Sequence, residues 1–199
     1  MQLWVGVGST WSIRALLCAK IAGISVDIKV INLSSEASKT ELLHVSETGL
    51  VPVLIASDDH SVVVHDSLAI AEYFNELSNG ALYPADLNTR AKARSLSAEI
   101  HSGFSAIRSC YPFSCDASLE SGLLTAREQK ELDRLNTIFS AAEGAFYFQK
   151  ASIVDAFLAV MAWRLDQYGI KLAPKAERYA KSLLTWELFQ EVAAEVRQW

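Results

Sequence analysis

Residues 49–74 constrain the fold more than any other part of the sequence. The pair Val51-Pro52 predicts a rigid corner, because proline lacks a backbone N–H and restricts the residue before it. Two runs rich in β-branched residues follow, 53–55 and 62–64, with the polar segment 57–61 between them. This pattern predicts a β-hairpin that starts at a proline corner.

A helix is predicted directly after the hairpin, because apolar residues recur at helical spacing from Leu68 to Leu77. Asp66 and Ser67 precede this helix. Taken alone, such a pair is most often a helix cap, but a helix N-terminus also binds anions. His65, Asp66 and Ser67 do not form a catalytic triad, because neighbours in sequence cannot adopt that geometry.

The N-terminal segment predicts strands at 3–7 and 26–33, with a small polar loop at 8–12 and a helix at 13–22 between them. A strand–helix–strand unit of this kind implies parallel pairing. Residues 34–45 are polar and predict a marginal helix. With the hairpin and its helix, this order is a thioredoxin-like pattern with a mixed four-stranded sheet.

The β signal disappears after residues 79–87, which contain turn residues and a proline and read as a linker. We therefore expect an α/β domain at 1–78 and an all-α domain at 88–199. The helices expected in the second domain are one long helix at 89–109, one opened by a capping box at 125–128, an apolar one at 152–168, and one or two after 173.

Composition excludes several function classes. The net charge of −5 argues against a nucleic-acid partner, whose phosphates require clustered Lys and Arg. No long apolar run predicts a membrane span, and residues 1–7 do not resemble a signal peptide, so we expect a cytoplasmic protein. Cys18, Cys110 and Cys115 form no C-x-x-C pair, the histidines lack metal-ligand spacing, and no metal site is predicted.

Several segments resemble the cytosolic glutathione transferase superfamily, in the right order and over nearly the whole chain. They are Ser9–Arg14 before the first helix, Val51–Leu54, Asp66–Phe74, Leu82-Tyr83-Pro84, and Ser152–Ala156. The resemblance implies an N-terminal thioredoxin-like domain, an all-helical C-terminal bundle and glutathione as cosubstrate. The first segment is similar to the loop of the serine-type classes (zeta, tau and theta-like bacterial enzymes).

The resemblance implies that Ser9 is the catalytic serine, whose hydroxyl hydrogen-bonds the glutathione sulfur. A thiol of pKa about 8.5 is only a few per cent thiolate at neutral pH, and a hydroxyl donor at a helix N-terminus favours the anion. The alternative for Ser9 is a plain helix N-cap. Ser12 could cap the helix instead, and Thr10 is a possible second hydroxyl.

Four further positions match the glutathione-binding residues of the superfamily. Val51, before a cis-Pro52, would pair its backbone N–H and C=O with the cysteinyl part of the ligand. Asp66 and Ser67 would bind the γ-glutamyl end. The Asp66 carboxylate would pair with the ammonium group of the ligand, and the N–H and hydroxyl of Ser67 would donate to its carboxylate.

Two positions depart from the superfamily pattern. Leu50 stands where a Lys or Arg often precedes the Val-Pro pair, so a cation for the glycine carboxylate must come from elsewhere, with Lys39 and His44 as candidates. Trp11 stands where redox-type relatives carry a cysteine, which disfavours a glutathione-dependent reductase.

The sequence therefore predicts a glutathione transferase that conjugates the glutathione thiolate to small electrophiles. A glutathione-dependent isomerase of the maleylacetoacetate isomerase type and a non-catalytic binding or regulatory protein are the alternatives. The pocket for the electrophile is expected in the C-terminal domain, where Tyr111, Phe113 and His101 are candidates for lining or for packing. We also expect a homodimer, as is usual in the superfamily.

Overall fold

The computed structural model describes residues 1–57, 59, 61–115 and 122–199. The chain divides into two compact units. One contains Met1–Leu82 together with Val192–Trp199, and the other contains Tyr83–Glu191. The domain limits expected at 78 and 88 stay a prediction. Two residues of the predicted hairpin turn, Asp58 and His60, lie outside the described residues.

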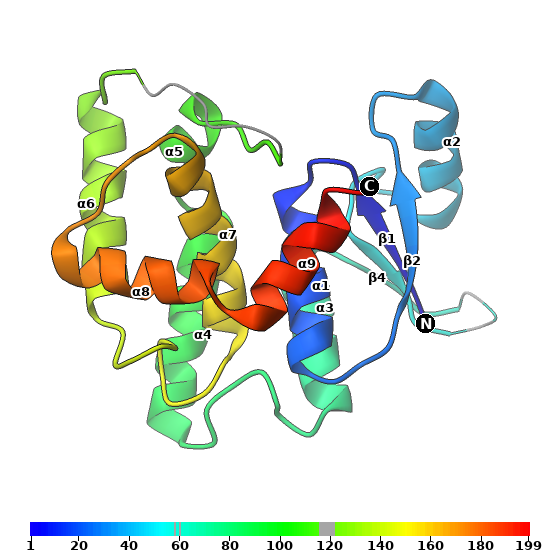
Figure 1. Ribbon diagram of the computed structural model, residues 1–199. Coiled ribbons are helices and arrows are strands. Elements are labelled where there is room, and N and C mark those ends of the chain that lie inside the picture. Colours follow the sequence, from blue (N-terminus) through cyan, green and yellow to red (C-terminus); the bar gives the residue numbers. More distant parts are fainter. Residues whose placement is uncertain (58, 60, 116–121) are drawn as a thin grey trace. The chain divides into compact units, whose positions relative to one another are not determined.

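The first unit is built on a four-stranded mixed sheet of order β2-β1-β3-β4 (Figure 1). β1 pairs in parallel with β2, as the strand–helix–strand pattern predicted, while β3 is antiparallel to both β1 and β4. The strands are β1 (Gln2–Gly6), β2 (Asp27–Ile31), β3 (Val53–Ile55) and β4 (Val63–His65).

Three helices cover this sheet: α1 (Thr10–Ile21), α2 (Glu36–Val45) and α3 (Ser67–Leu77). α1 and α3 lie together on one face, and α2 lies on the other side of the sheet (Figure 1). α2 packs on the sheet through Leu42. This side chain is fully buried in a cluster with Trp4, Ile31, Val53 and Ile55. The expected helices are thus confirmed, although α1 begins three residues earlier than predicted.

The second unit is helical among its described residues, as expected. Its helices are α4 (Leu87–Ser102), α5 (Ser105–Cys110), α6 (Ala126–Ser140), α7 (Ile153–Gln167) and α8 (Pro174–Leu184), and α9 (Glu187–Val196) crosses the boundary between the units. The capping box predicted at 125–128 is present as Thr125/Glu128, and Ser152 and Asp155 form a second one at the start of α7.

The single long helix predicted at 89–109 is wrong. α4 ends at Ser102 with Gly103 as its C-cap, and α5 starts after Phe104, whose φ of 61° lies in the left-handed region. A Cβ on Gly103 would lie 2.7 Å from the carbonyl oxygen of Glu99, so glycine permits this close turn. The periodic pattern continues across the break because α5 still packs an apolar face inward.

α7 forms the centre of the second unit, as its apolar sequence predicted. All of its residues except Asp166 are buried. Asp155, in its first turn, accepts hydrogen bonds from the backbone N–H and hydroxyl of Ser152, from the N–H of Tyr147 and from the hydroxyl of Tyr179, all at 2.7–2.9 Å. Burial raises the pKa of Asp155, while these donors oppose the shift.

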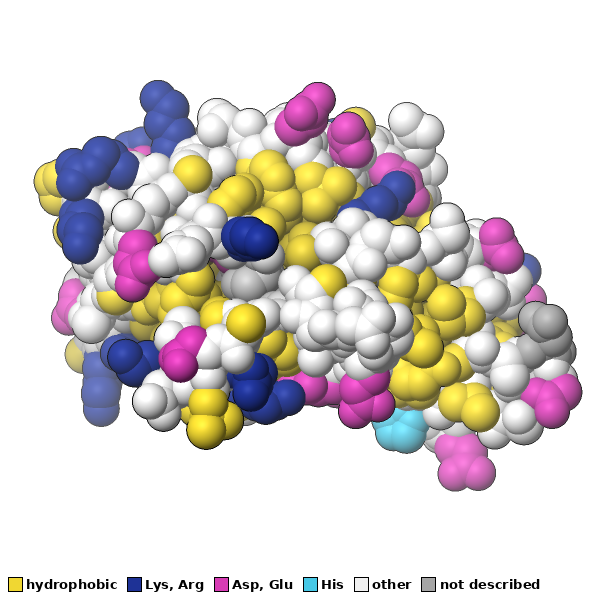
Figure 2. Space-filling model, turned by 90° about the horizontal axis from the view of Figure 1, so that it is seen from below, with side chains coloured by type: hydrophobic (Ala, Val, Ile, Leu, Met, Phe, Trp, Pro, Cys, Tyr) yellow, Lys and Arg dark blue, Asp and Glu magenta, His cyan; other side chains and the backbone are white. Residues whose placement is uncertain are grey.

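The surface carries apolar patches between charged side chains of both signs, as one face shows in Figure 2. Cys18, Cys110 and Cys115 are free thiols, and Cys18 is buried. No helix of the described residues is long and apolar enough to cross a bilayer.

Candidate functional site

The register of the sheet brings the predicted site residues to one edge. Gly6 at the end of β1 pairs with Ile31 at the end of β2, Trp4 pairs with Val53 at the start of β3, and Val53 pairs with His65 at the end of β4. The loop to Ser9, the corner at Val51-Pro52 and the turn to Ser67 therefore all leave the sheet at the same edge.

Direct packing confirms that the first two of these segments are close. A Cβ on Gly6 would lie 2.7 Å from Cγ2 of Val51 and 2.8 Å from Cδ1 of Leu33. A contact below 3 Å forces a shift, so only glycine lets the Val51 corner lie this close to the end of β1.

Ser9 is the N-cap of α1. Its side-chain oxygen accepts a hydrogen bond from the backbone N–H of Ser12 at 3.3 Å. Since this bond uses a lone pair of the oxygen, the hydroxyl proton of Ser9 is still available for donation. The N-cap alternative is thus present in the structure and is compatible with a second role for the same hydroxyl.

The suggestion that Ser12 caps the helix in place of Ser9 is wrong. Ser12 is fully buried, and its hydroxyl oxygen accepts a hydrogen bond from the backbone N–H of Gly6 at 3.1 Å. Ser12 therefore ties the start of α1 to the end of β1 and lies beneath the loop. Thr10, the other hydroxyl considered, is the first helical residue and is largely buried.

Arg14 is a feature that the sequence analysis did not recognise as buried. It lies on α1 and is the largest fully buried side chain, with its guanidinium 4.6 Å from the centre of the Trp11 ring. Its charge lowers the pKa of Cys18, although burial of that thiol has the larger, opposite effect. An arginine in an otherwise apolar helix face is the sequence signal that could have indicated it.

The peptide bond between Val51 and Pro52 is cis, as predicted. Val51 lies outside the strand pairing, which stops at Trp4 and Val53. Within the described residues, neither its N–H nor its C=O takes part in a turn or loop hydrogen bond. Both backbone groups can therefore pair with an extended peptide placed along this corner.

Asp66 and Ser67 occupy the start of α3. Asp66 is the N-cap with a φ of 75°, and its Oδ1 accepts hydrogen bonds from the N–H groups of Leu68 at 2.7 Å and Ala69 at 3.3 Å. The cap alternative is therefore correct for this side chain. A positive φ in a residue other than glycine costs about 1–3 kcal/mol, and such strain concentrates at binding sites.

Ser67 differs from Asp66 because its hydroxyl is orphaned. The side chain is only 1% exposed, and among the described residues its Oγ has no hydrogen-bond partner. Buried hydroxyls are nearly always paired, and leaving one unpaired costs about 1–3 kcal/mol. An oxygen of a bound ligand would satisfy it, which makes Ser67 the residue that fits a ligand best.

Lys39 stays a prediction as a binding residue. Its Nζ lies 2.6 Å from Oε1 of Glu36 on the exposed surface of α2. His44 and Leu50 are exposed as well.

The residues proposed for the electrophile, His101, Tyr111 and Phe113, belong to the second unit. Each packs against an aromatic ring of α7 or its C-cap: His101 on Phe157, Tyr111 on Tyr168 and Phe113 on Trp163. Within the described residues there is no group of three His, Cys, Asp or Glu that could hold a metal ion.

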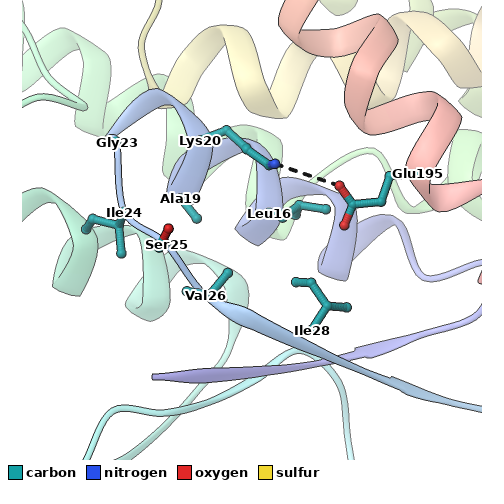
Figure 3. Close-up of a pocket in the computed structure, with 9 residues that line it drawn as sticks. All are labelled: Leu16, Ala19, Lys20, Gly23, Ile24, Ser25, Val26, Ile28 and Glu195. Carbon is teal, nitrogen blue, oxygen red and sulfur yellow. Dashed lines mark ion pairs between the residues drawn. The ribbon is translucent and has the colours of Figure 1, made fainter.

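A separate pocket of about 240 Å³ lies at the other end of α1 from Ser9 (Figure 3). The side chains of Leu16, Ala19, Val26 and Ile28 form its apolar part. Lys20 on α1 and Glu195 on α9 form an ion pair at its rim, at 3.8 Å. Both partners are about 40% exposed, so the pair contributes little to stability. None of the predicted site residues lines this pocket.

Comparison with known proteins places this geometry among the glutathione transferases. A glutathione transferase homolog from Burkholderia GL BGR1, with bound glutathione, has the same fold at a TM-score of 0.74 and 26% identity, covering 99% of this chain and 97% of that one. The glutathione S-transferase N-terminal domain family matches residues 8–77, which include α1, the Val51-Pro52 corner and α3. Residues 8–77 thus carry a glutathione S-transferase N-terminal domain, and the chain as a whole has the glutathione transferase fold.

Two further relatives of this chain have names that describe different proteins. A "Stringent starvation protein A homolog" from Coxiella burnetii is 26% identical over 204 residues, covering 98% of this chain and 92% of the relative. A "Probable maleylacetoacetate isomerase" from Caenorhabditis elegans is 32% identical over 95 residues, covering 47% of this chain and 42% of the relative.

Proposed function

We propose that the first unit binds glutathione at the edge of the sheet formed by Ser9, Val51 and Ser67, and that it stabilises the glutathione thiolate. The observation that carries this proposal is the orphaned, buried hydroxyl of Ser67 at the start of a helix, near a corner whose backbone groups are unused. The glutathione-bound Burkholderia homolog supports the same ligand.

Each part of the ligand has a matching group at this edge. The N–H and C=O of Val51 suit the cysteinyl backbone, which would add to the cis-Pro52 corner as a short strand does. The hydroxyl of Ser67 and the N-terminus of α3 suit the γ-glutamyl carboxylate. The carboxylate of Asp66, which caps α3 through Oδ1, has the charge that suits the ammonium group.

Ser9 then acts on the sulfur. Its hydroxyl donates a hydrogen bond to the thiolate, and the positive end of α1 adds a favourable potential. Lowering the thiol pKa by two units requires about 2.7 kcal/mol, within reach of one charge-assisted hydrogen bond and a helix N-terminus. The buried charge of Arg14 on the same helix acts in the same direction.

With such a thiolate, the protein would conjugate glutathione to small electrophiles. The sulfur forms a bond to an electrophilic carbon, and the leaving group of that carbon departs with its electron pair. No general base is needed during this step, because the thiol has already lost its proton to solvent.

A second candidate is a glutathione-binding protein without turnover. It is favoured by the relative from Coxiella burnetii, which matches nearly the whole chain and whose name states no reaction. An isomerase is the third candidate, supported by the relative from Caenorhabditis elegans over about half of the chain.

The test compares wild type with Ser9→Ala. We expect wild type to bind glutathione, to show thiolate absorbance near neutral pH and to conjugate a generic aromatic halide, and Ser9→Ala to lose the last two properties while it still binds. Thr125→Ala, which removes an N-cap from α6 in the other unit, is the matched control for a loss of stability.

The outcomes separate the candidates. Binding and thiolate formation without conjugation of any member of an electrophile panel would favour the second candidate, and turnover of a maleyl substrate would favour the third. Absence of glutathione binding would reject the proposal. The predicted homodimer and cytoplasmic location belong to the same proposal, and light scattering of the purified protein tests the first of them.

A further inference from the structure

Glutathione has a third group, the glycine carboxylate, and among the described residues both lysines near this edge of the sheet are already paired with glutamates. The position of this carboxylate follows from the proposed function and from the direction in which the bound ligand would run. Ser67, which takes the γ-glutamyl end, follows β4 at one side of the sheet, and Val51 precedes the neighbouring strand β3. The glycyl end therefore points away from β4, toward the side of β1, β2 and α2.

Apolar side chains bound this side. Leu33, Val45 and Val51 pack against the buried cluster that contains Leu42 of α2. Leu50, next to the corner, is 69% exposed, and Leu43 is 57% exposed. A Cβ on Gly49 would lie 3.0 Å from Cδ2 of Leu43. Leu43 therefore lies against this loop.

Both lysines on this side are paired with glutamates, and His44 is the remaining basic side chain. Residues 29–50 contain two lysines, three glutamates and one histidine. Lys39 lies 2.6 Å from Glu36, and Lys29 lies 3.1 Å from Glu41, which leaves Glu47 as the third acidic residue. A ligand carboxylate placed here would meet a net negative segment and would compete with a glutamate for either lysine.

We propose that the cradle recognises the γ-glutamylcysteinyl part of its ligand and does not select for the third carboxylate, with Leu50 as the residue that determines this specificity. The ligand class is γ-glutamylcysteinyl thiols, including those in which the third carboxylate is blocked or absent.

The experiment measures the affinity of the full chain for three probes by calorimetry. The probes are glutathione, the C-terminal amide of glutathione, and γ-glutamylcysteine. For wild type we expect the dissociation constants of glutathione and its amide to agree within about twofold, since no cation distinguishes them. Lys39→Ala should leave this ratio unchanged.

The matched variants are Leu50→Lys and Leu77→Lys. Both replace an exposed leucine of the same unit, and Leu77 lies at the opposite end of α3 from Ser67. We expect Leu50→Lys to bind glutathione about threefold to fivefold more tightly than the amide, as an exposed ion pair allows. We expect Leu77→Lys to show the wild-type ratio.

The inference is overturned if wild type prefers glutathione to its amide by about tenfold or more, or if Leu50→Lys shows no preference. Failure of all three probes to bind wild type rejects the glutathione cradle itself, so the two failures are distinguishable. A preference in wild type that Lys39→Ala abolishes would assign the glycine carboxylate to Lys39.

Discussion

The side-chain oxygen of Ser9 lies 3.3 Å from the backbone nitrogen of Ser12 and caps the first turn of α1. This contact orients the Ser9 oxygen at the N-terminus of the helix, where the positive end of the helix dipole lies. One side chain can thus stabilise the helix through its lone pair and act on a ligand through its proton.

Replacing Ser9 with glycine should separate these two roles. Glycine at an N-cap costs only a few tenths of a kcal/mol, whereas alanine costs about 1 kcal/mol. We expect Ser9→Gly to keep nearly wild-type stability in urea unfolding, and Ser9→Ala to lose about 1 kcal/mol. Both variants should raise the pKa of bound glutathione equally, as the thiolate absorbance reports. If the thiol of bound glutathione kept its wild-type pKa in Ser9→Gly, the Ser9 hydroxyl would act only as a cap.

Gly6→Ala adds only one methyl group, but it should lower both the stability of the protein and its affinity for glutathione. The new methyl group would lie 2.7 Å from Val51 Cγ2 and 2.8 Å from Leu33 Cδ1, so these side chains have to shift. We expect a loss of about 1–3 kcal/mol in stability, as in other overpacked cores, and a weaker affinity for glutathione. Gly144→Ala is the control, because nothing lies within 4 Å of the position of its Cβ. Wild-type affinity in Gly6→Ala would show that the position of Val51 does not matter for binding.

Asp155→Ala should be the most destabilising single change in the second unit. It leaves four buried donors, from Ser152, Tyr147 and Tyr179, without their acceptor. We expect a loss of about 3–5 kcal/mol in urea unfolding monitored by circular dichroism. Asp166→Ala, at the exposed position of the same helix, should change stability by less than about 0.5 kcal/mol. Similar losses in both variants would contradict the role of the Asp155 network.

The ion pair between Glu99 and Arg134 should make stability depend on pH. Hydrogen bonds from Arg134 to the Glu99 carboxylate at 2.6 Å lower the pKa of Glu99. Its folded-state pKa is therefore below the unfolded value of about 4.3, so its contribution is present above that pH and is lost as the pH falls through the folded pKa.

We expect wild type to exceed Glu99→Gln in unfolding free energy at pH 7, and the difference to decrease toward zero in acid. Urea titrations of both proteins at a series of pH values measure this. A difference that stays constant with pH would mean that the carboxylate charge contributes nothing.

Much of the architecture could be predicted from the sequence, because it depends on local patterns. The capping boxes at Thr125 and Ser152 follow from residue types three positions apart, and the thioredoxin-like order follows from the spacing of apolar residues. The break at Phe104 could not be predicted in this way, since its left-handed conformation interrupts a helical pattern that continues on both sides.

The candidate site shows the same division. The residue types at the proline corner and at the starts of α1 and α3 could be identified from the sequence, and the resemblance to the superfamily marked Leu50 as a departure. The fold was needed to see that Ser12 is buried, and that the buried hydroxyl of Ser67 has no hydrogen-bond partner among the described residues. The physical reason is that burial and pairing depend on the strand order β2-β1-β3-β4, which joins chain segments that are far apart in sequence.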